Sequence, residues 1–98
     1  MHAFNVMEIF QLAGRGLVVI TDKTYETLPA RLALKIGDPV EFRQTSHTLL
    51  KTWVTGIEHL DPWSPKHTFA FTLPFEVMKD DIPVGSEIWV SSASILPE

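Results

Sequence analysis

The chain has 98 residues, of which 45% are hydrophobic, 20% charged and 10% aromatic, and its formal net charge is -4. This length makes one domain over residues 1–98, and the composition lies outside the disordered class, which is poor in aromatic residues and high in net charge. The absence of cysteine excludes a disulfide framework and a thiolate metal site, and no apolar run suggests a membrane span, so we expect a cytoplasmic protein.

Apolar residues recur with a period of two along much of the chain, which is typical of β-strands. Residues 4–10 alternate in this way and are followed by Gly14-Arg15-Gly16 and a β-branched run over 17–21. This pattern predicts a hairpin, because β-branched residues favour strands and glycine permits the positive φ of a tight turn.

The segment 27–38 has two interpretations. Pro29 near its start and Gly37 near its end would suit a short helix, whereas its apolar residues at 28, 30, 32, 34 and 36 share one parity. The alternation favours extended structure, which leads through the turn residues Gly37-Asp38-Pro39 into a strand over 40–43.

Further strands are expected over 49–60, 67–73 and 87–90. The first of these should be long and bent, with Gly56 marking a bulge or a close approach of two backbones. Two prolines make the segment after Asp61 a loop, and the tail over 91–98 is expected to fray.

Six or seven short strands, regular turns and no convincing long helix predict an all-β fold, namely a small closed antiparallel β-barrel. Side chains fill the interior of so small a barrel, so we expect no ligand cavity through its middle. The expected interior residues include Val18, Ile20, Leu34, Val40, Val54 and Phe71.

Three motifs follow one another along the chain. They are Gly14-Arg15-Gly16-Leu17-Val18-Val19, Lys35-Ile36-Gly37-Asp38-Pro39-Val40-Glu41-Phe42 and Val54-Thr55-Gly56-Ile57-Glu58. Their order resembles that of the second domain, a β-barrel, of elongation factor Tu and related translation GTPases. The resemblance implies a free-standing barrel of the translation-factor domain 2 type. In that family the barrel helps to hold the aminoacylated end of transfer RNA and faces the small ribosomal subunit.

Nucleotide binding is not expected, because the chain contains no Gly-x-x-x-x-Gly-Lys-Ser/Thr motif. Nor is an enzyme or a cofactor expected, since no serine lies in a nucleophile elbow. His59, Asp61 and His67 flank one loop and could in principle bind a metal or act as acid and base, but we expect no metal site there.

Basic residues concentrate in the first half of the chain. Residues 1–51 hold six basic and five acidic side chains, whereas residues 52–98 hold two basic and seven acidic ones. Arg15, at the tip of the expected hairpin, could contact an RNA phosphate or a partner's carboxylate, or could simply be solvated. The other basic residues could form a stripe, or could serve only solubility. They are Lys23, Arg31, Lys35, Arg43 and Lys51.

Trp63 lies between two prolines, so it could be an exposed aromatic anchor on a rigid loop or a plug at the end of the barrel. Trp53 and Trp89 lie in expected strands, so we expect their side chains to pack in the core or in the wall of the barrel. The sequence therefore predicts a non-enzymatic binding module for a protein or ribonucleoprotein, with RNA or ribosome association as the first hypothesis and protein interaction or self-association as the alternative. The candidate contact residues are Arg15, Lys23, Arg43, Lys51 and Trp63.

Overall fold

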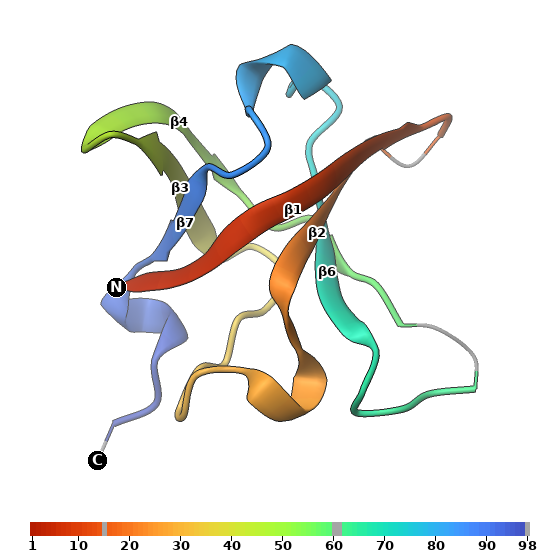
Figure 1. Ribbon diagram of the computed structural model, residues 1–98, viewed down its shortest axis with the longest axis vertical. Helices are drawn as coiled ribbons and strands as arrows, with labels where there is room; N and C mark the ends of the chain where they lie inside the picture. The colour runs from red at the N-terminus through yellow and green to blue at the C-terminus, as the bar shows by residue number, and fades with distance from the viewer. Residues whose placement is uncertain (15, 60–61, 98) are drawn as a thin grey trace.

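The computed structural model describes residues 1–14, 16–59 and 62–97, and within these ranges it contains seven strands and three short 3-10 helices (Figure 1). The strands are β1 (His2–Leu12), β2 (Gly16–Thr24), β3 (Pro39–Gln44), β4 (His47–Trp53), β5 (Gly56–Ile57), β6 (Thr68–Leu73) and β7 (Glu87–Val90). The 3-10 helices are η1 (Tyr25–Thr27), η2 (Lys79–Asp81) and η3 (Ser92–Ser94). The predicted all-β class is confirmed. None of these described helices is long and apolar enough to cross a lipid bilayer.

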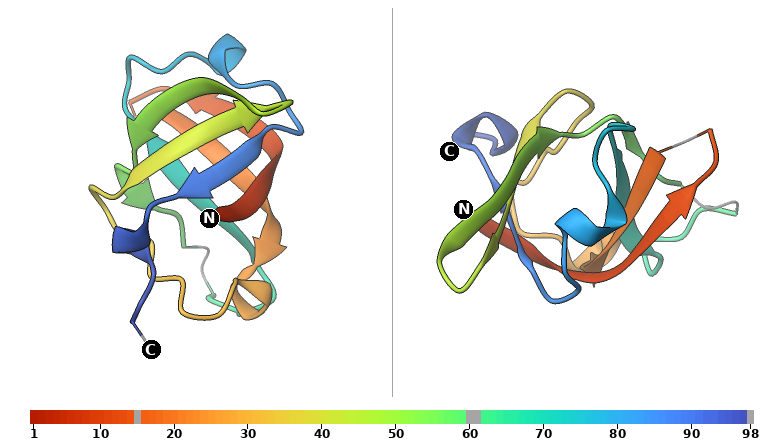
Figure 2. Two further views of the ribbon diagram at one scale, coloured as in Figure 1. Left: turned by 90° about the vertical axis from the view of Figure 1, so that its left-hand side faces the viewer. Right: turned by 90° about the horizontal axis from the view of Figure 1, so that it is seen from above.

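All seven strands belong to one antiparallel sheet in the order β4-β3-β7-β1-β2-β6-β5. The sheet curls around its core, as Figure 2 shows from above. Its two end strands, β4 and β5, are consecutive in the chain and are joined by Val54 and Thr55 alone. No ladder pairs β4 with β5 among the described residues, so the closed barrel predicted from the sequence is not confirmed.

Two glycine-dependent features of the prediction are confirmed. Strands β1 and β2 form a hairpin, and Gly14 and Gly16 have φ values of 79° and 80°. The close backbone approach predicted at Gly56 is also present, since a Cβ atom there would lie 2.8 Å from the Thr72 hydroxyl oxygen, but the single long strand predicted over 49–60 is wrong, because the chain forms the two strands β4 and β5 instead. Only glycine allows β5 to approach β6 so closely at this position.

The inner face of the curled sheet is apolar. Its largest fully buried side chains are Phe4, Phe42, Phe71, Leu17, Leu73 and Ile88. Val40, Val54 and Phe71 belong to this core, as predicted, whereas Leu34 is half-buried and packs against its margin.

The prediction that Val18 and Ile20 lie inside holds only in part. Val18 is buried, at 5% exposure, but Ile20 is half-buried, and neither residue belongs to the main core cluster. Leu17 and Val19 join the core, and the residues of opposite parity therefore lie on the outer face of β2. Period alone could not decide between the faces, because residues 17–20 are apolar on both. The outer face of the sheet consequently carries apolar side chains at this point.

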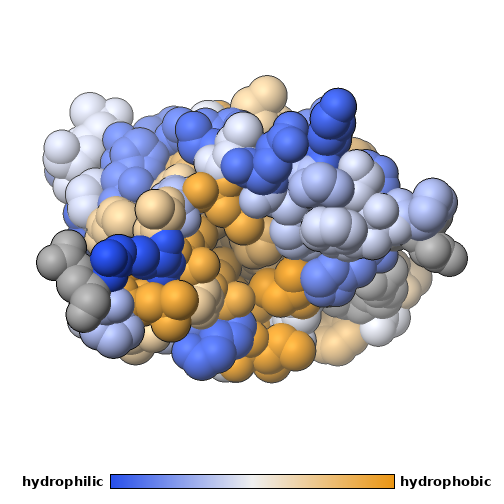
Figure 3. Space-filling view, turned by 90° about the horizontal axis from the view of Figure 1, so that it is seen from below, coloured by the Kyte–Doolittle hydropathy of each residue, from blue (hydrophilic) through white to orange (hydrophobic). Residues whose placement is uncertain are grey.

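The segment 28–36 contains no strand of the sheet and no helix, so its predicted extended structure does not become a β-strand. Leu28, Leu32 and Leu34 are half-buried against the core, and Arg31 adopts a φ of 68°. The alternation of these leucines therefore reflects side-chain packing across one end of the sheet rather than hydrogen bonding within a β-ladder. Figure 3 views this end from below and shows hydrophobic side chains gathered around a hollow.

The tail after β7 is tied down, contrary to the expected fraying. The Ser94 side chain is fully buried, and its hydroxyl donates to the Asp38 carboxylate at 2.9 Å. The Ala33 amide donates to the Ser94 carbonyl at 2.7 Å, and Leu32 forms an isolated bridge with Ile95. The tail closes over the segment 28–36 because a buried serine and carboxylate satisfy each other there.

Candidate functional site

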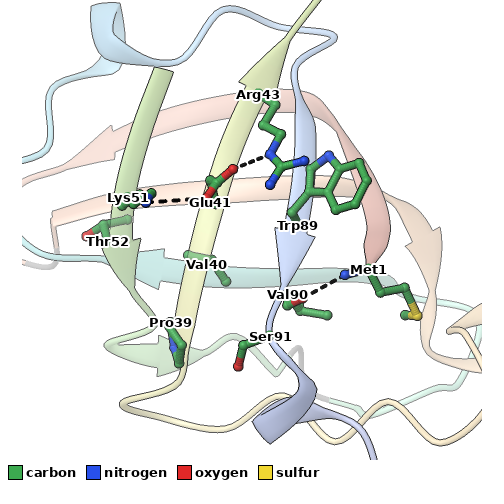
Figure 4. A pocket seen from close by; sticks show the side chains of 10 residues that line it. All are labelled: Met1, Pro39, Val40, Glu41, Arg43, Lys51, Thr52, Trp89, Val90 and Ser91. Atoms are coloured by element: carbon green, nitrogen blue, oxygen red, sulfur yellow. Dashed lines mark hydrogen bonds and ion pairs between the residues drawn. The ribbon is translucent and has the colours of Figure 1, made fainter. Parts of the chain in front are cut away.

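Two of the predicted contact residues, Arg43 and Lys51, lie together on the outer face of β3 and β4 (Figure 4). Val40 and Phe42 of β3 are buried in the core, so alternation directs Glu41 and Arg43 outward. The register pairs Glu41 with Lys51, which brings both basic residues to one carboxylate.

Glu41 is the centre of this group. Arg43 Nε donates a hydrogen bond to its carboxylate, the Thr48 hydroxyl donates another at 3.0 Å, and Lys51 Nζ lies 4.0 Å from Oε1. The hydrogen bond from Arg43 lowers the pKa of Glu41, and this effect outweighs the opposing effect of burial. Glu41 therefore stays ionised and holds the guanidinium in place.

Trp89 of β7 provides an aromatic face beside these charges. Its ring centroid lies 4.1 Å from Arg43 Cζ, and the His2 ring stacks on it with centroids 5.7 Å apart and planes at 18°. The indole N–H donates to the Glu87 carboxylate at 2.9 Å, which fixes the ring. We call this group the Arg43 surface, and its members are His2, Glu41, Arg43, Lys51 and Trp89.

The sequence did not single out Trp89 or His2 as contact residues. Ile88 and Val90 are buried, so the period of two around Trp89 carried the signal that its side chain faces outward. The meeting of His2 with Trp89 depends on the pairing of β1 with β7, which no local pattern reveals.

A hollow of about 310 Å³ lies beside these residues and also borders Met1, Pro39 and Ser91 (Figure 4). It offers a guanidinium, an ammonium and an aromatic ring, which are groups suited to binding an anion or a planar ring, beside the Glu41 carboxylate that already pairs with both cations. Among the described residues, no group of three His, Asp or Glu side chains could hold a metal ion.

No other predicted basic residue within the described ranges lines this hollow. Lys23 lies on β2 and borders a separate hollow with Met7 and Asp22. Lys35 pairs with Asp38 at 3.4 Å within a turn. Arg15 lies outside the described residues. The basic stripe considered from the sequence is thus reduced to Arg43 and Lys51.

Trp63 is 56% exposed and lies edge-on to Tyr25, with ring centroids 5.9 Å apart. The Tyr25 ring also packs against His59 and Phe69, and its hydroxyl donates to the Glu58 carbonyl at 2.5 Å. Burial raises the pKa of Tyr25, and the charge of Glu58 adds to the effect. Trp63 therefore presents an exposed ring supported by other aromatic side chains, and its role as an anchor stays a prediction.

The loop histidines have different surroundings. His59 stacks on Tyr25, whereas His67 borders a groove on the outer face of β2. Asp61, the third residue considered for a metal or an acid–base pair, lies outside the described residues.

No family model matches this sequence, and no curated protein matches it either.

Proposed function

We propose that this protein is a non-enzymatic binding module that associates with single-stranded RNA through the Arg43 surface. The observation that carries the proposal is the stack of Arg43 and His2 on Trp89, with Lys51 nearby. Proteins that bind single strands without sequence preference combine cationic side chains for the phosphates with exposed rings for the bases. An open sheet face suits this task better than a deep pocket would.

We further propose that the chain is a free-standing relative of domain 2 of elongation factor Tu. The order of the three glycine-containing motifs supports this relationship. A module of that kind would act in the cytoplasm, which is consistent with the absence of cysteine. The ribosome would then be the natural source of the RNA. With a net charge of -4, the protein should bind weakly and locally rather than coat nucleic acid.

Fluorescence anisotropy with a labelled single-stranded RNA tests the proposal. We expect Arg43→Ala to weaken binding about tenfold, because it removes both a phosphate contact and a stacking partner. Lys79→Ala is the matched control, since it removes an exposed positive charge from η2 and should leave the affinity nearly unchanged. Equal losses in the two variants, or binding that does not weaken between about 50 and 200 mM salt, would contradict the proposal.

A second candidate function is protein binding or self-association through Trp63. The supporting observation is the 56% exposure of this ring on a base formed by Tyr25. Tryptophan and tyrosine are common among the residues that dominate protein interfaces. Sedimentation of the wild type and of Trp63→Ala tests self-association, and a monomer in both cases would remove that half of the candidate.

A further inference from the structure

The outer face of β1, β2 and β6 carries a second concave surface, far larger than the hollow at Arg43. It is a groove of about 600 Å³, and Tyr25 and the chain around His67 form one of its walls. We call it the β2 groove, and its lining residues are Glu8, Phe10, Leu12, Val18, Ile20, Tyr25, Glu58, Lys66, His67, Thr68 and Ala70. It shares no residue with the Arg43 surface.

The floor of the β2 groove is apolar because strand register brings outward-facing apolar residues together. Phe10 pairs with Val18 across β1 and β2, and Ile20 pairs with Ala70 across β2 and β6. Phe10 and Leu12 remain 47% and 40% exposed, so one side of the groove still presents apolar surface to water. A volume of this size and lining suits a small organic molecule.

Two polar groups border the apolar floor, and the carboxylate among them defines the chemistry of that molecule. Glu8 pairs with Ile20 and so stands at the end of the apolar floor, where its exposed carboxylate has no hydrogen bond or ion pair within the described ranges. His67 Nδ1 is buried and also lacks a hydrogen-bond partner in the described part of the chain. Since either ring nitrogen of a histidine can carry the proton, His67 sets no preference of its own, whereas the Glu8 carboxylate favours a ligand that brings positive charge and N–H donors.

We propose that the β2 groove binds an organic ammonium with an apolar body. The alkyl or aromatic part lies over Val18, Ile20 and Ala70, and the ammonium group meets the Glu8 carboxylate. Glu58 also lines the groove, and its backbone amide donates to the Ala70 carbonyl at 3.0 Å. Lys66 is the opposing charge in the lining and reduces the affinity for a cation.

Three probes with the same alkyl tail test this assignment, namely octylammonium, 1-octanol and octanoate, each below its aggregation concentration. Two-dimensional amide NMR reports both the affinity and the location of binding. We expect octylammonium to bind most tightly and octanoate least, with the largest shift changes at Phe10, Ile20 and Ala70. Tighter binding of octanoate, or shift changes centred outside the groove, would overturn the proposal.

Two charge variants test the assignment further, because they should change the affinity for octylammonium in opposite directions. Glu8→Gln should weaken octylammonium binding about two- to fivefold and leave octanol unaffected, whereas Lys66→Gln should strengthen octylammonium binding by a similar factor. Glu76→Gln is the matched control, since this exposed carboxylate does not line the groove. All these positions are exposed, so the variants should fold. An unchanged preference for the cation in Glu8→Gln would refute the role of Glu8.

Discussion

Gly16 begins β2 where the neighbouring backbone leaves no room for a side chain. A Cβ atom there would lie 2.6 Å from the Leu73 carbonyl oxygen, and the residue has a φ of 80°. We expect Gly16→Ala to lower the free energy of unfolding by about 2–4 kcal/mol, because it combines a clash with a strained backbone.

Urea denaturation followed by tryptophan fluorescence measures this loss. Gly14→Ala is the control, because its φ is 79° but a Cβ atom would meet nothing within 4 Å. Its cost should be only the left-handed conformation of the backbone, about 1–2 kcal/mol. Equal costs in the two variants would show that the approach to Leu73 is unimportant.

The buried pair of Ser94 and Asp38 joins the tail to the turn before β3. We expect Ser94→Ala to lower the free energy of unfolding by about 1–3 kcal/mol, because the Asp38 carboxylate loses a buried donor. Ser92→Ala provides the control within the same 3-10 helix, since Ser92 is exposed. Thermal unfolding of the two variants compares them directly.

Acid should weaken the same contact. Burial tends to raise the pKa of Asp38, but hydrogen bonds from Ser94 and Lys35 outweigh it and lower the pKa below its ordinary value of 3.8. As the pH falls from about 4 through the folded-state pKa, the unfolded chain takes up the proton first, so acid favours unfolding. Asp38→Asn should therefore reduce the dependence of stability on pH below about pH 4. An unchanged slope in urea denaturation at several pH values would contradict this expectation.

At the scale of elements, the two-residue turn that closes the hairpin of β3 and β4 is occupied by residues that do not favour its conformation. Gln44 pairs with His47, and the two residues between them, Thr45 and Ser46, have φ values of 51° and 65°. Such two-residue turns favour Asn-Gly, and a β-branched residue is strained in this conformation.

Replacement of the turn by Thr45→Asn with Ser46→Gly should therefore raise the free energy of unfolding by about 1–2 kcal/mol. The rise should appear as a higher thermal midpoint. Since the Arg43 side chain is not altered, RNA affinity in the anisotropy assay should stay within about twofold. A lower midpoint would mean that Thr45 or Ser46 makes a stabilising contact that outweighs its strain.

The period of two was sufficient to locate most of the strands, because strands such as β3 and β7 bury only one face. It failed where both faces are apolar, as at Val18 and Ile20, and where alternating residues pack against the end of the sheet, as at Leu32 and Leu34. In both cases the alternation reported burial correctly, but not the element or face responsible for it.

The candidate site was predictable only in part for a related reason. Arg43 and Lys51 were recognised because they lie on consecutive strands joined by a short turn. Their meeting with Trp89 and His2 requires β7 to lie between β3 and β1, a pairing between distant segments. The β2 groove depends in the same way on the pairing of β2 with β6.

For the whole molecule, the tail after Val90 is part of the fold. Truncation after Val90 removes the Ser94 hydroxyl from Asp38, the Ser94 carbonyl from the Ala33 amide, and the apolar cover of Ile95. Ser94→Ala alone should lower the free energy of unfolding by about 1–3 kcal/mol, and we expect the truncation to lower it by more. Urea denaturation of the two proteins side by side gives the comparison, and equal losses would show that the rest of the tail contributes nothing.

Val54 and Thr55 connect β4 to β5, the two end strands of the sheet. Both amides are engaged, that of Val54 with the Asp38 carbonyl at 2.9 Å and that of Thr55 with the Thr72 carbonyl at 2.9 Å, and Val54 is fully buried. These two hydrogen bonds would have to open before a protease could cleave the chain at Val54 and Thr55. A nick there would let the two end strands, which no described ladder pairs, move apart, and exposed strand edges recruit other chains, so the intact peptide bonds between them also guard the protein against aggregation.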